Sequence, residues 1–155
     1  MQVIQFVNNF PRFRFFNKGI ISNWLVKIAK TEGKTISNIQ YIFCSDAEIL
    51  EINKSFLKHN YFTDIITFDY SQNHGLEAEI YVSIETVRSN AVLFHVKPTE
   101  ELNRVIIHGL LHIIGYNDKM QQDAEIMRKK ENECLGQLNN MILDQGKTVS
   151  RGTKA

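Results

Sequence analysis

The sequence predicts an α+β domain, in which about five helices pack on a small mixed sheet of about four strands. Strand-like runs alternate with helical patterns as far as Ser83, whereas only helical patterns follow from Ile84 onward. The 155 residues, of which 43% are hydrophobic and 23% charged, suffice for one globular core. We therefore expect a single domain over residues 1–145 and a basic, mobile tail over residues 146–155.

The first strands and the first helix follow from simple patterns. Residues 3–7 form a short apolar run that predicts the opening strand. Residues 18–32 carry apolar side chains at helical spacing, and Gly33 is a residue type at which helices commonly end. Residues 36–44 alternate sufficiently between apolar and polar side chains to predict a second strand.

The middle of the chain predicts a helix and a pair of strands. Asp46 is a natural N-cap for a helix that reaches Phe56. Residues 64–68 are rich in β-branched side chains and predict a strand, and residues 79–83 predict the strand that returns beside it. Between these strands, residues 72–75 read Gln-Asn-His-Gly, which is typical of a turn.

The last part of the chain is helical in pattern. Apolar side chains predict three helices, over about residues 84–95, 98–115 and 120–137. Pro98 favours a helix start, because proline fits the first turn of a helix. The tail after residue 145 is basic and has no apolar pattern, which is why we expect it to be mobile.

The charge balance and the cysteines restrict the functional class. Lys plus Arg number 18 and Asp plus Glu 17, which gives a formal net charge of +1. This excludes binding to nucleic acid by bulk charge, so such a contact must use a local patch. Cys44 and Cys134 are too few for a disulfide framework, and we expect reduced thiols. Without a recognisable signal or membrane span, we expect a cytoplasmic protein that has no membrane partner.

The most informative residues lie in the predicted helix 98–115 and directly after it. His108 and His112 are four residues apart, so on a helix they share one face. Gly115 is a natural helix end, after which the chain can turn back and present Asp118. Two imidazoles and one carboxylate, with a fourth position open to water, make a known form of catalytic zinc site. We expect one Zn²⁺ per chain, held by His108, His112 and Asp118.

Chance spacing and a structural zinc site account less well for this pattern. If the histidines fell at this spacing by chance, the flanking apolar residues would bury two imidazoles that need polar partners. A structural zinc site is usually closed by four ligands rich in cysteine, and neither Cys44 nor Cys134 lies in a recognisable ligand pair.

The metal motif also carries a family resemblance. Residues 108–118 (HGLLHIIGYND) resemble the HGxLHLxGYDH signature of the YbeY endoribonucleases. Residues 63–68 (TDIITF) are similar to that family's TNVLSF or TDVLSF sequence, and residues 79–83 (EIYVS) to its GDIxIS strand. Met127 and Glu131 follow the family's spacing after the metal motif. The similarity covers about residues 40–135 in the family's order.

The resemblance implies both a fold and a function. It implies an α+β fold and a zinc-dependent endoribonuclease that is specific for single-stranded RNA. It also implies a role in maturing the 3′ end of 16S rRNA and in the quality control of 70S ribosomes. The expected partners are therefore ribosomal RNA and the small ribosomal subunit or its associated proteins.

Two positions depart from the family's pattern. The family's third histidine is Asp118 here, which preserves a metal ligand but changes its charge. The arginine that the family is expected to use for holding a phosphate is Leu57 here. A substitute must come from Lys58 or His59, which we keep as candidate site residues, although both are equally explained as solvated loop residues.

The residue after the first histidine restricts the chemistry. Zinc peptidases of the HExxH type place a glutamate there as general base, whereas this chain has Gly109, which disfavours peptidase activity. Phosphodiester cleavage stays open by two routes, a metal-activated water or attack by the RNA 2′-hydroxyl. Gly109 has a second use, because it allows another chain segment to approach closely beside His108.

Further contacts with RNA stay open between binding and ordinary structural roles. The candidates are the pair Arg12 and Arg14, the run Arg128-Lys129-Lys130 and the basic tail, with Phe13, Phe15 and Phe16 as rings for base stacking. Basic runs are more often solvated faces, and aromatic residues this dense are usually core. Glu131 is explained equally well as a hydrogen-bond partner of a ligand imidazole or as a surface glutamate.

Two alternative functions also stay open. A metal-stabilised ribosome-assembly binding module with little catalysis is favoured by the missing arginine at Leu57 and by the missing base at Gly109. A metallohydrolase of another substrate class is compatible with the same metal site, because a fold and a metal do not determine the substrate.

Overall fold

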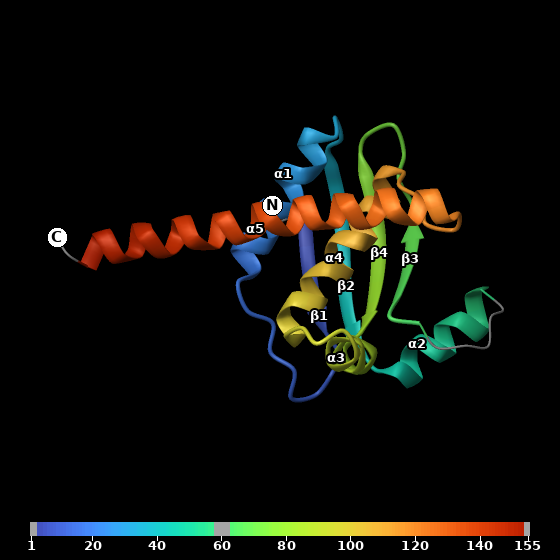
Figure 1. Ribbon diagram of the computed structural model, residues 1–155. Coiled ribbons are helices and arrows are strands. Elements are labelled where there is room, and N and C mark those ends of the chain that lie inside the picture. Colours follow the sequence, from blue (N-terminus) through green and yellow to red (C-terminus); the bar gives the residue numbers. More distant parts are fainter. Residues whose placement is uncertain (1–2, 58–62, 154–155) are drawn as a thin grey trace.

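The computed structural model describes residues 3–57 and 63–153; of Leu57 and of residues 147–153 it describes the backbone alone. The strands are β1 (Ile4–Asn8), β2 (Ile36–Cys44), β3 (Ile65–Asp69) and β4 (Leu76–Ser83). The helices are α1 (Lys18–Thr31), α2 (Asp46–Ile52), α3 (Ile84–Leu93), α4 (Pro98–Ile114) and α5 (Gln121–Thr153) (Figure 1). A short π-helical segment, η1 (Asn53–Leu57), continues α2.

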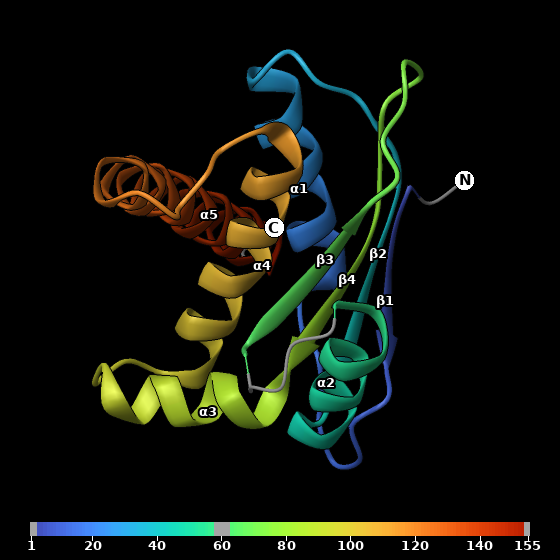
Figure 2. The same cartoon turned by 90° about the vertical axis from the view of Figure 1, so that its right-hand side faces the viewer.

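The strands form one mixed sheet in the order β1-β2-β4-β3. β1 and β4 both run parallel to β2, whereas β3 runs antiparallel to β4. Figure 2 shows α1, α4 and α5 on one side of the sheet and α2 on the other. The prediction of an α+β fold with a small mixed sheet and five helices is therefore confirmed for the described part of the chain.

The two faces of the sheet bury different clusters. The larger cluster lies under α1 and α4 and includes Ile80 of β4 and Ile106 of α4. The smaller cluster lies under α2 and joins Ile49 to Cys44 and Ile66. Because side chains alternate along a strand, the sheet must be apolar on both faces to hold helices on both sides.

Helix α4 lies directly against the sheet. The buried hydroxyl of Tyr41 in β2 donates to the carbonyl oxygen of Ile106 at 2.9 Å, which ties the helix to the sheet. A Cβ atom at Gly109 would lie 2.9 Å from Cδ1 of Ile65 and 3.2 Å from Cγ2 of Ile80. Because Gly109 has no side chain, α4 can approach Ile65 of β3 and Ile80 of β4 closely, as the sequence predicts. The half of α4 that carries the histidines therefore lies beside β3.

The cap of α2 and the length of α5 differ from the expectations. Ser45 rather than Asp46 caps α2, because its side chain accepts a hydrogen bond from the backbone N–H of Glu48. Asp46 instead accepts hydrogen bonds from the hydroxyls of Ser83 and Thr86, which join α2 to the start of α3. Helix α5 is much longer than the expected 120–137, since its backbone stays helical to Thr153. The mobility of the tail stays a prediction.

Two expectations concern the cysteines and membranes. Cys44 and Cys134 are both buried and form no disulfide with one another. Burial raises the pKa of the Cys44 thiol to about 12 and that of Cys134 to about 11, so both stay protonated thiols at neutral pH. Among the residues that the structure describes, no helix is both long enough and apolar enough to cross a membrane.

Candidate metal centre

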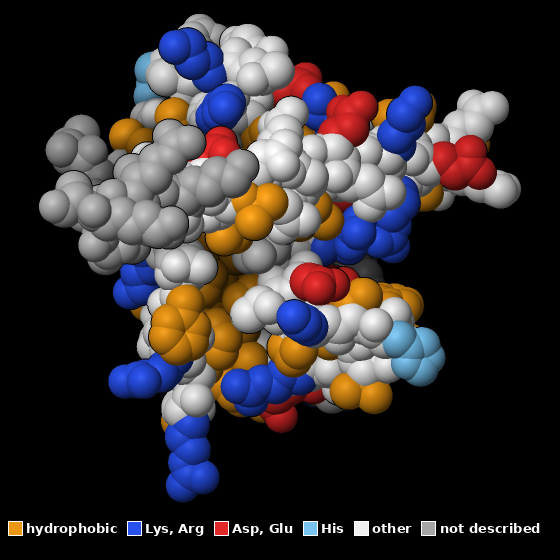
Figure 3. Space-filling view, turned by 60° about the vertical axis from the view of Figure 1, so that its left-hand side comes forward, with side chains coloured by type: hydrophobic (Ala, Val, Ile, Leu, Met, Phe, Trp, Pro, Cys, Tyr) orange, Lys and Arg blue, Asp and Glu red, His pale blue; other side chains and the backbone are white. Residues whose placement is uncertain are grey.

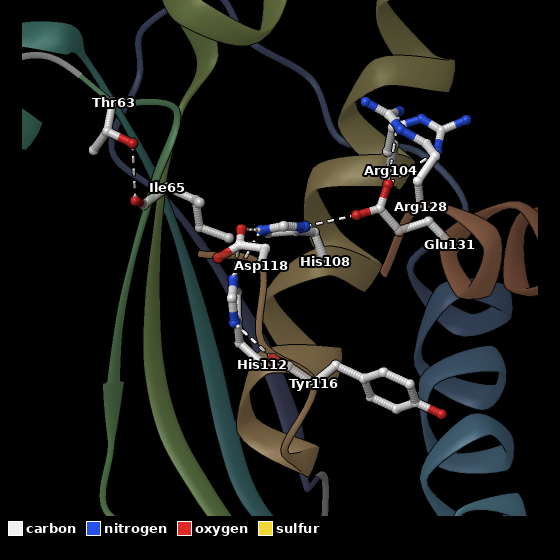
Figure 4. Close-up of polar contacts among 9 residues, drawn as sticks. All are labelled: Thr63, Ile65, Arg104, His108, His112, Tyr116, Asp118, Arg128 and Glu131. Carbon is white, nitrogen blue, oxygen red and sulfur yellow. Dashed lines mark hydrogen bonds and ion pairs between the residues drawn. The ribbon is translucent and has the colours of Figure 1, made fainter. Parts of the chain in front are cut away.

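His108, His112 and Asp118 meet at the C-terminal end of α4 (Figure 4). The Nε2 atoms of the two histidines lie 2.9 Å apart. Oδ2 of Asp118 lies 3.3 Å from each of these nitrogens. The structure thus brings together the three side chains that the sequence proposes as metal ligands, through one atom from each.

The end of α4 explains how Asp118 reaches the histidines. Gly115 follows the last helical residue with a φ of 130°, a left-handed conformation that glycine adopts readily. The N–H groups of Gly115 and Tyr116 both donate to the carbonyl oxygen of Leu111, which closes the helix. The chain then turns back along α4, so that Asp118 lies over the face that carries the histidines.

Hydrogen bonds to the other ring nitrogens determine the tautomers. Nδ1 of His112 lies 3.0 Å from the carbonyl oxygen of Tyr116, and this oxygen can only accept, so Nδ1 carries the proton. Nδ1 of His108 lies 2.6 Å from Oε2 of Glu131 and donates to it. In the neutral rings both Nε2 atoms therefore carry lone pairs, and these point at each other and at the Asp118 carboxylate.

Three acceptor atoms this close repel one another unless a proton or a metal cation lies between them. Donor atoms about 2.0–2.1 Å from a tetrahedral zinc ion are about 3.3 Å apart, which is close to the observed separations. The side chains of His108, His112 and Asp118 are 23%, 26% and 38% exposed, so the site is open on one side. These residues therefore fit a small divalent cation that keeps an open coordination position.

Glu131 of α5 supports the site from behind. It is only 4% exposed, and its second carboxylate oxygen accepts a hydrogen bond from Arg104 at 2.9 Å. Burial raises the pKa of Glu131, but the hydrogen bonds from His108 and Arg104 outweigh it, and the pKa lies below its ordinary value. Glu131 is therefore a buried, ionised partner of the imidazole of His108, a candidate ligand, and its interpretation as a surface glutamate is wrong.

The pKa of His108 responds to the same contacts. Burial lowers this pKa, because it disfavours the charged ring. The hydrogen bond to Glu131 and the charges of Glu131, Asp118 and Asp64 act in the opposite direction and prevail, so the pKa of His108 is raised. In the metal-free protein, the carboxylates around His108 thus favour a positive charge at the position where a metal ion would supply one.

A cleft of about 290 Å³ opens beside His108, between α3, α4 and α5. Its walls include Asp64, Phe94, Arg104 and Arg128, which the metal motif alone does not identify. Burial raises the pKa of the Asp64 carboxyl, which faces the same cleft. Arg104 lies four residues, or about one helical turn, before His108. The sequence spacing could therefore have predicted that Arg104 shares the face of α4 that carries His108. The contributions of α3 and β3 depend on tertiary packing and leave no such signal.

The remaining sequence candidates have different outcomes. Lys58 and His59 lie outside the described residues, so their part in the site stays a prediction. Arg128 lines the cleft, whereas Lys130 forms an ion pair with Glu32 at 2.8 Å on the side of α1. Arg12, Arg14 and the phenylalanines beside them border a different hollow.

Comparisons with known proteins identify relatives of this chain. The family model described as Endoribonuclease YbeY matches residues 11–139. A Parabacteroides distasonis protein named Endoribonuclease YbeY is 48% identical over 118 residues, which cover 76% of this chain and 83% of that protein. One of the same name from Cytophaga hutchinsonii is 44% identical over 135 residues, or 86% of this chain and 94% of its relative.

A solved structure is similar as well. The solution structure of a Thermotoga maritima protein is 28% identical and superposes with a TM-score of 0.59, covering 88% of this chain and 92% of the other. The family match, the relatives and the shared fold lead to one conclusion. The chain belongs to the YbeY endoribonuclease family.

Proposed function

We propose that this protein is a zinc-dependent endoribonuclease that cleaves single-stranded ribosomal RNA in the cytoplasm. Its substrate is the 3′ end of 16S rRNA on the small ribosomal subunit, and the same activity serves the quality control of 70S ribosomes. The observation that carries the proposal is the convergence of one possible ligand atom from each of His108, His112 and Asp118, in a chain whose relatives are named endoribonucleases.

Each protein group has a defined task in this proposal. His108, His112 and Asp118 hold the metal ion, which when bound can acidify a water or polarise a phosphoryl oxygen. Glu131 and the Tyr116 carbonyl keep the Nδ1 protons in place, so that both Nε2 atoms stay available as ligands.

The cleft supports the binding of an unpaired strand. Phe94 is 52% exposed at the cleft wall, where its ring can stack on a base that is not already stacked in a duplex. The guanidinium group of Arg128 forms a 3.7 Å ion pair with Glu131, but its side chain is 58% exposed, so it can also meet a phosphate from the solvent side. Arg128 thus offers a cation on the α5 side of the cleft. This cation can compensate for the family arginine that this chain replaces with Leu57.

Cleavage and metal content test the proposal together. Purified protein should cleave a single-stranded rRNA fragment, lose this activity with a chelator and recover it with Zn²⁺. Elemental analysis should find one zinc per chain in the wild type and none in the His108→Ala/His112→Ala variant. Cleavage that survives in the His112→Ala variant would come from a contaminating ribonuclease, and full metal content in the double variant would contradict the proposed ligands.

Arg128 has a matched neighbour for testing the contact with RNA. We expect Arg128→Ala to raise the KM for single-stranded RNA by about three- to tenfold while zinc content stays unchanged. Lys129→Ala removes the same charge from an adjacent exposed residue that does not line the cleft, and it should have a much smaller effect. Equal effects of the two variants on KM would show that Arg128 acts only through the net charge of the protein and makes no specific contact with RNA.

A binding module with little catalysis is the second candidate function. It is favoured by Gly109, which supplies no general base, and by Leu57 in place of the family arginine. It predicts that wild-type protein binds zinc and single-stranded RNA but leaves the RNA intact under conditions in which a catalytically active relative cleaves it.

A further inference from the structure

A second hollow lies on another part of the surface, away from the metal ligands. It is bordered by the loop of residues 12–17, by α3, by the first turns of α4 and by Ile142 of α5. Figure 3 shows this face, where hydrophobic side chains gather in a depression and Lys and Arg side chains surround it. Its volume of about 320 Å³ is within the range of ligand pockets, about 300–1,000 Å³. We call it the arginine-rimmed groove.

The floor of the arginine-rimmed groove is aliphatic. It consists of Ile21, Ile84, Val87 and Leu102, each at most 7% exposed, with Ile142 at the side. These side chains offer no hydrogen-bond donor or acceptor. A group that lies against this floor must therefore be apolar itself, because a polar group there would lose its hydrogen bonds to water. Asn17, Thr99 and Asn103 also line the groove and can bond to polar parts of the same occupant.

The rim carries the opposite kind of chemistry. Arg12, Arg14 and Arg88 are exposed, and no aspartate or glutamate is among the described residues that line the groove. Within the described part of the chain, none of the three guanidinium groups is in an ion pair; Arg88 lies 5.4 Å from the centre of the Phe10 ring. For a chain whose net charge is only +1, this is a local concentration of unpaired positive charge.

We infer that the arginine-rimmed groove binds an acidic segment of a partner protein, which inserts one or two large apolar side chains and places aspartates or glutamates against Arg12, Arg14 and Arg88. The apolar floor supplies the binding energy, and the rim supplies orientation and selects the sign of the charge. This inference is independent of RNA cleavage, because the groove shares no residue with the metal centre.

RNA fits the groove less well than an acidic peptide. Aliphatic side chains do not present flat faces to a base, and a base inserted there would bury its polar edges without partners. The rings of Phe13 and Phe15 already pack on Phe43, and of these loop phenylalanines only Phe16, at 65% exposure, is largely open to solvent. The C-terminal residues of this chain are also unsuitable, because Lys147, Arg151 and Lys154 are basic.

A peptide series tests the inference with the full-length protein. The probes are fluorescein-labelled peptides in which Leu and Phe, at helical or extended spacing, are flanked by Asp and Glu, and binding is followed by fluorescence anisotropy. We expect at least one of these peptides to bind saturably, and its counterpart with Asn and Gln in place of the acids to bind about tenfold more weakly. If no member of the series binds, the inference is wrong.

Charge reversal shows whether binding occurs at the groove. Arg14→Glu/Arg88→Glu should weaken binding of the acidic peptide by about tenfold or more. Lys27→Glu/Lys30→Glu changes the net charge equally on exposed residues of α1 outside the groove, and it should leave binding nearly unchanged. Unfolding curves confirm that both double variants are folded, and equal weakening by both would overturn the inference.

Competition separates the proposed occupant from RNA and from self-association. An excess of unlabelled single-stranded RNA should not displace the peptide in the presence of a chelator, and the peptide should not inhibit cleavage of RNA. If RNA displaces the peptide and loses affinity in the Arg14→Glu/Arg88→Glu variant, the groove is an RNA site. If that variant abolishes a dimer of the wild type in sedimentation, the occupant is a second copy.

Discussion

Lys130 and Glu131 are neighbours on α5, yet Lys130 forms a partly exposed ion pair and Glu131 forms buried hydrogen bonds. Successive helical residues point about 100° apart, so Lys130 turns toward α1 and Glu131 toward α4. Lys130 forms an ion pair with Glu32 at 2.8 Å, in which both side chains are 22% exposed. The Glu131 side chain is 5% exposed and bonds to both Arg104 and His108.

The difference between the two contacts indicates a division of work. A partly exposed ion pair contributes little to stability, commonly about 0–1 kcal/mol. The fully buried Trp24 of α1 also joins the two helices, because its indole N–H donates to the carbonyl oxygen of Cys134 in α5. A buried carboxylate is costly unless it is fully paired. Glu131 is paired, and one of its partners is a candidate metal ligand. We therefore assign the Lys130 side to the fold and the Glu131 side to the metal centre.

The largest effect should come from breaking the buried contact. Glu131→Gln keeps the size of the side chain but weakens its hold on Nδ1 of His108, so we expect metal affinity to fall about 10- to 100-fold. Competition with a chromogenic chelator measures this affinity. Glu133→Gln is the matched control, because Glu133 is largely exposed on the same helix and, among the described residues, forms an ion pair with Lys130 alone. Equal affinities of Glu131→Gln and wild type would show that the contact does not support metal binding.

The contrast also explains how far the sequence leads. Helix α4 and the meeting of His108, His112 and Asp118 were predictable, because an i, i+4 spacing and a glycine stop act within a few residues. The sequence could not decide whether Glu131 bonds to a ligand imidazole or lies on the surface, because this depends on how α5 crosses α4. The extent of α5 was also underestimated: Leu138, Met141 and Ile142 continue the apolar helical spacing beyond residue 137 and pack on the core, and the backbone then stays helical to Thr153.

Capping was a second place where local rules competed. Ser45 and Asp46 are both good N-cap residues, and their sequence does not decide which one caps α2. In the structure Ser45 takes the cap, and Asp46 binds the hydroxyls of Ser83 and Thr86. This arrangement needs β4 and α3 to lie beside α2, which is a consequence of the sheet order and not of the local sequence.

Tyr116 allows the two contacts to be separated within one residue. Its hydroxyl donates to Glu32 at 3.1 Å on the α1 side, whereas its carbonyl oxygen accepts from His112 on the metal side. Tyr116→Phe removes the first bond and keeps the second, so we expect a loss of about 1 kcal/mol in the free energy of unfolding. Metal affinity should stay within about twofold of wild type. Denaturant unfolding and chelator competition test both expectations, and a large loss of metal affinity would mean that the two sides are coupled.

The smallest effect should appear at Glu32, and its pH dependence has a definite sign. The hydrogen bond from Lys130 lowers the pKa of Glu32 below its ordinary value of 4.5; burial opposes this shift, and the Tyr116 hydroxyl adds to it. A carboxyl whose pKa is lower in the folded state stabilises the fold above its unfolded pKa, and it loses this contribution as the pH falls through the folded value. Near neutral pH, Glu32→Gln should therefore cost less than about 1 kcal/mol, since the pair is partly exposed and screened by solvent.

The same variant gives the test of that sign. The difference in unfolding free energy between wild type and Glu32→Gln should stay constant from neutral pH down to about pH 5. It should then shrink as Glu32 becomes protonated in the folded wild-type protein, because both proteins then carry a neutral side chain at this position. Added salt should reduce the neutral-pH difference as well, since the pair is partly exposed. A difference that grows on acidification would require a raised pKa for Glu32, and would contradict the assignment of Lys130 as its main partner.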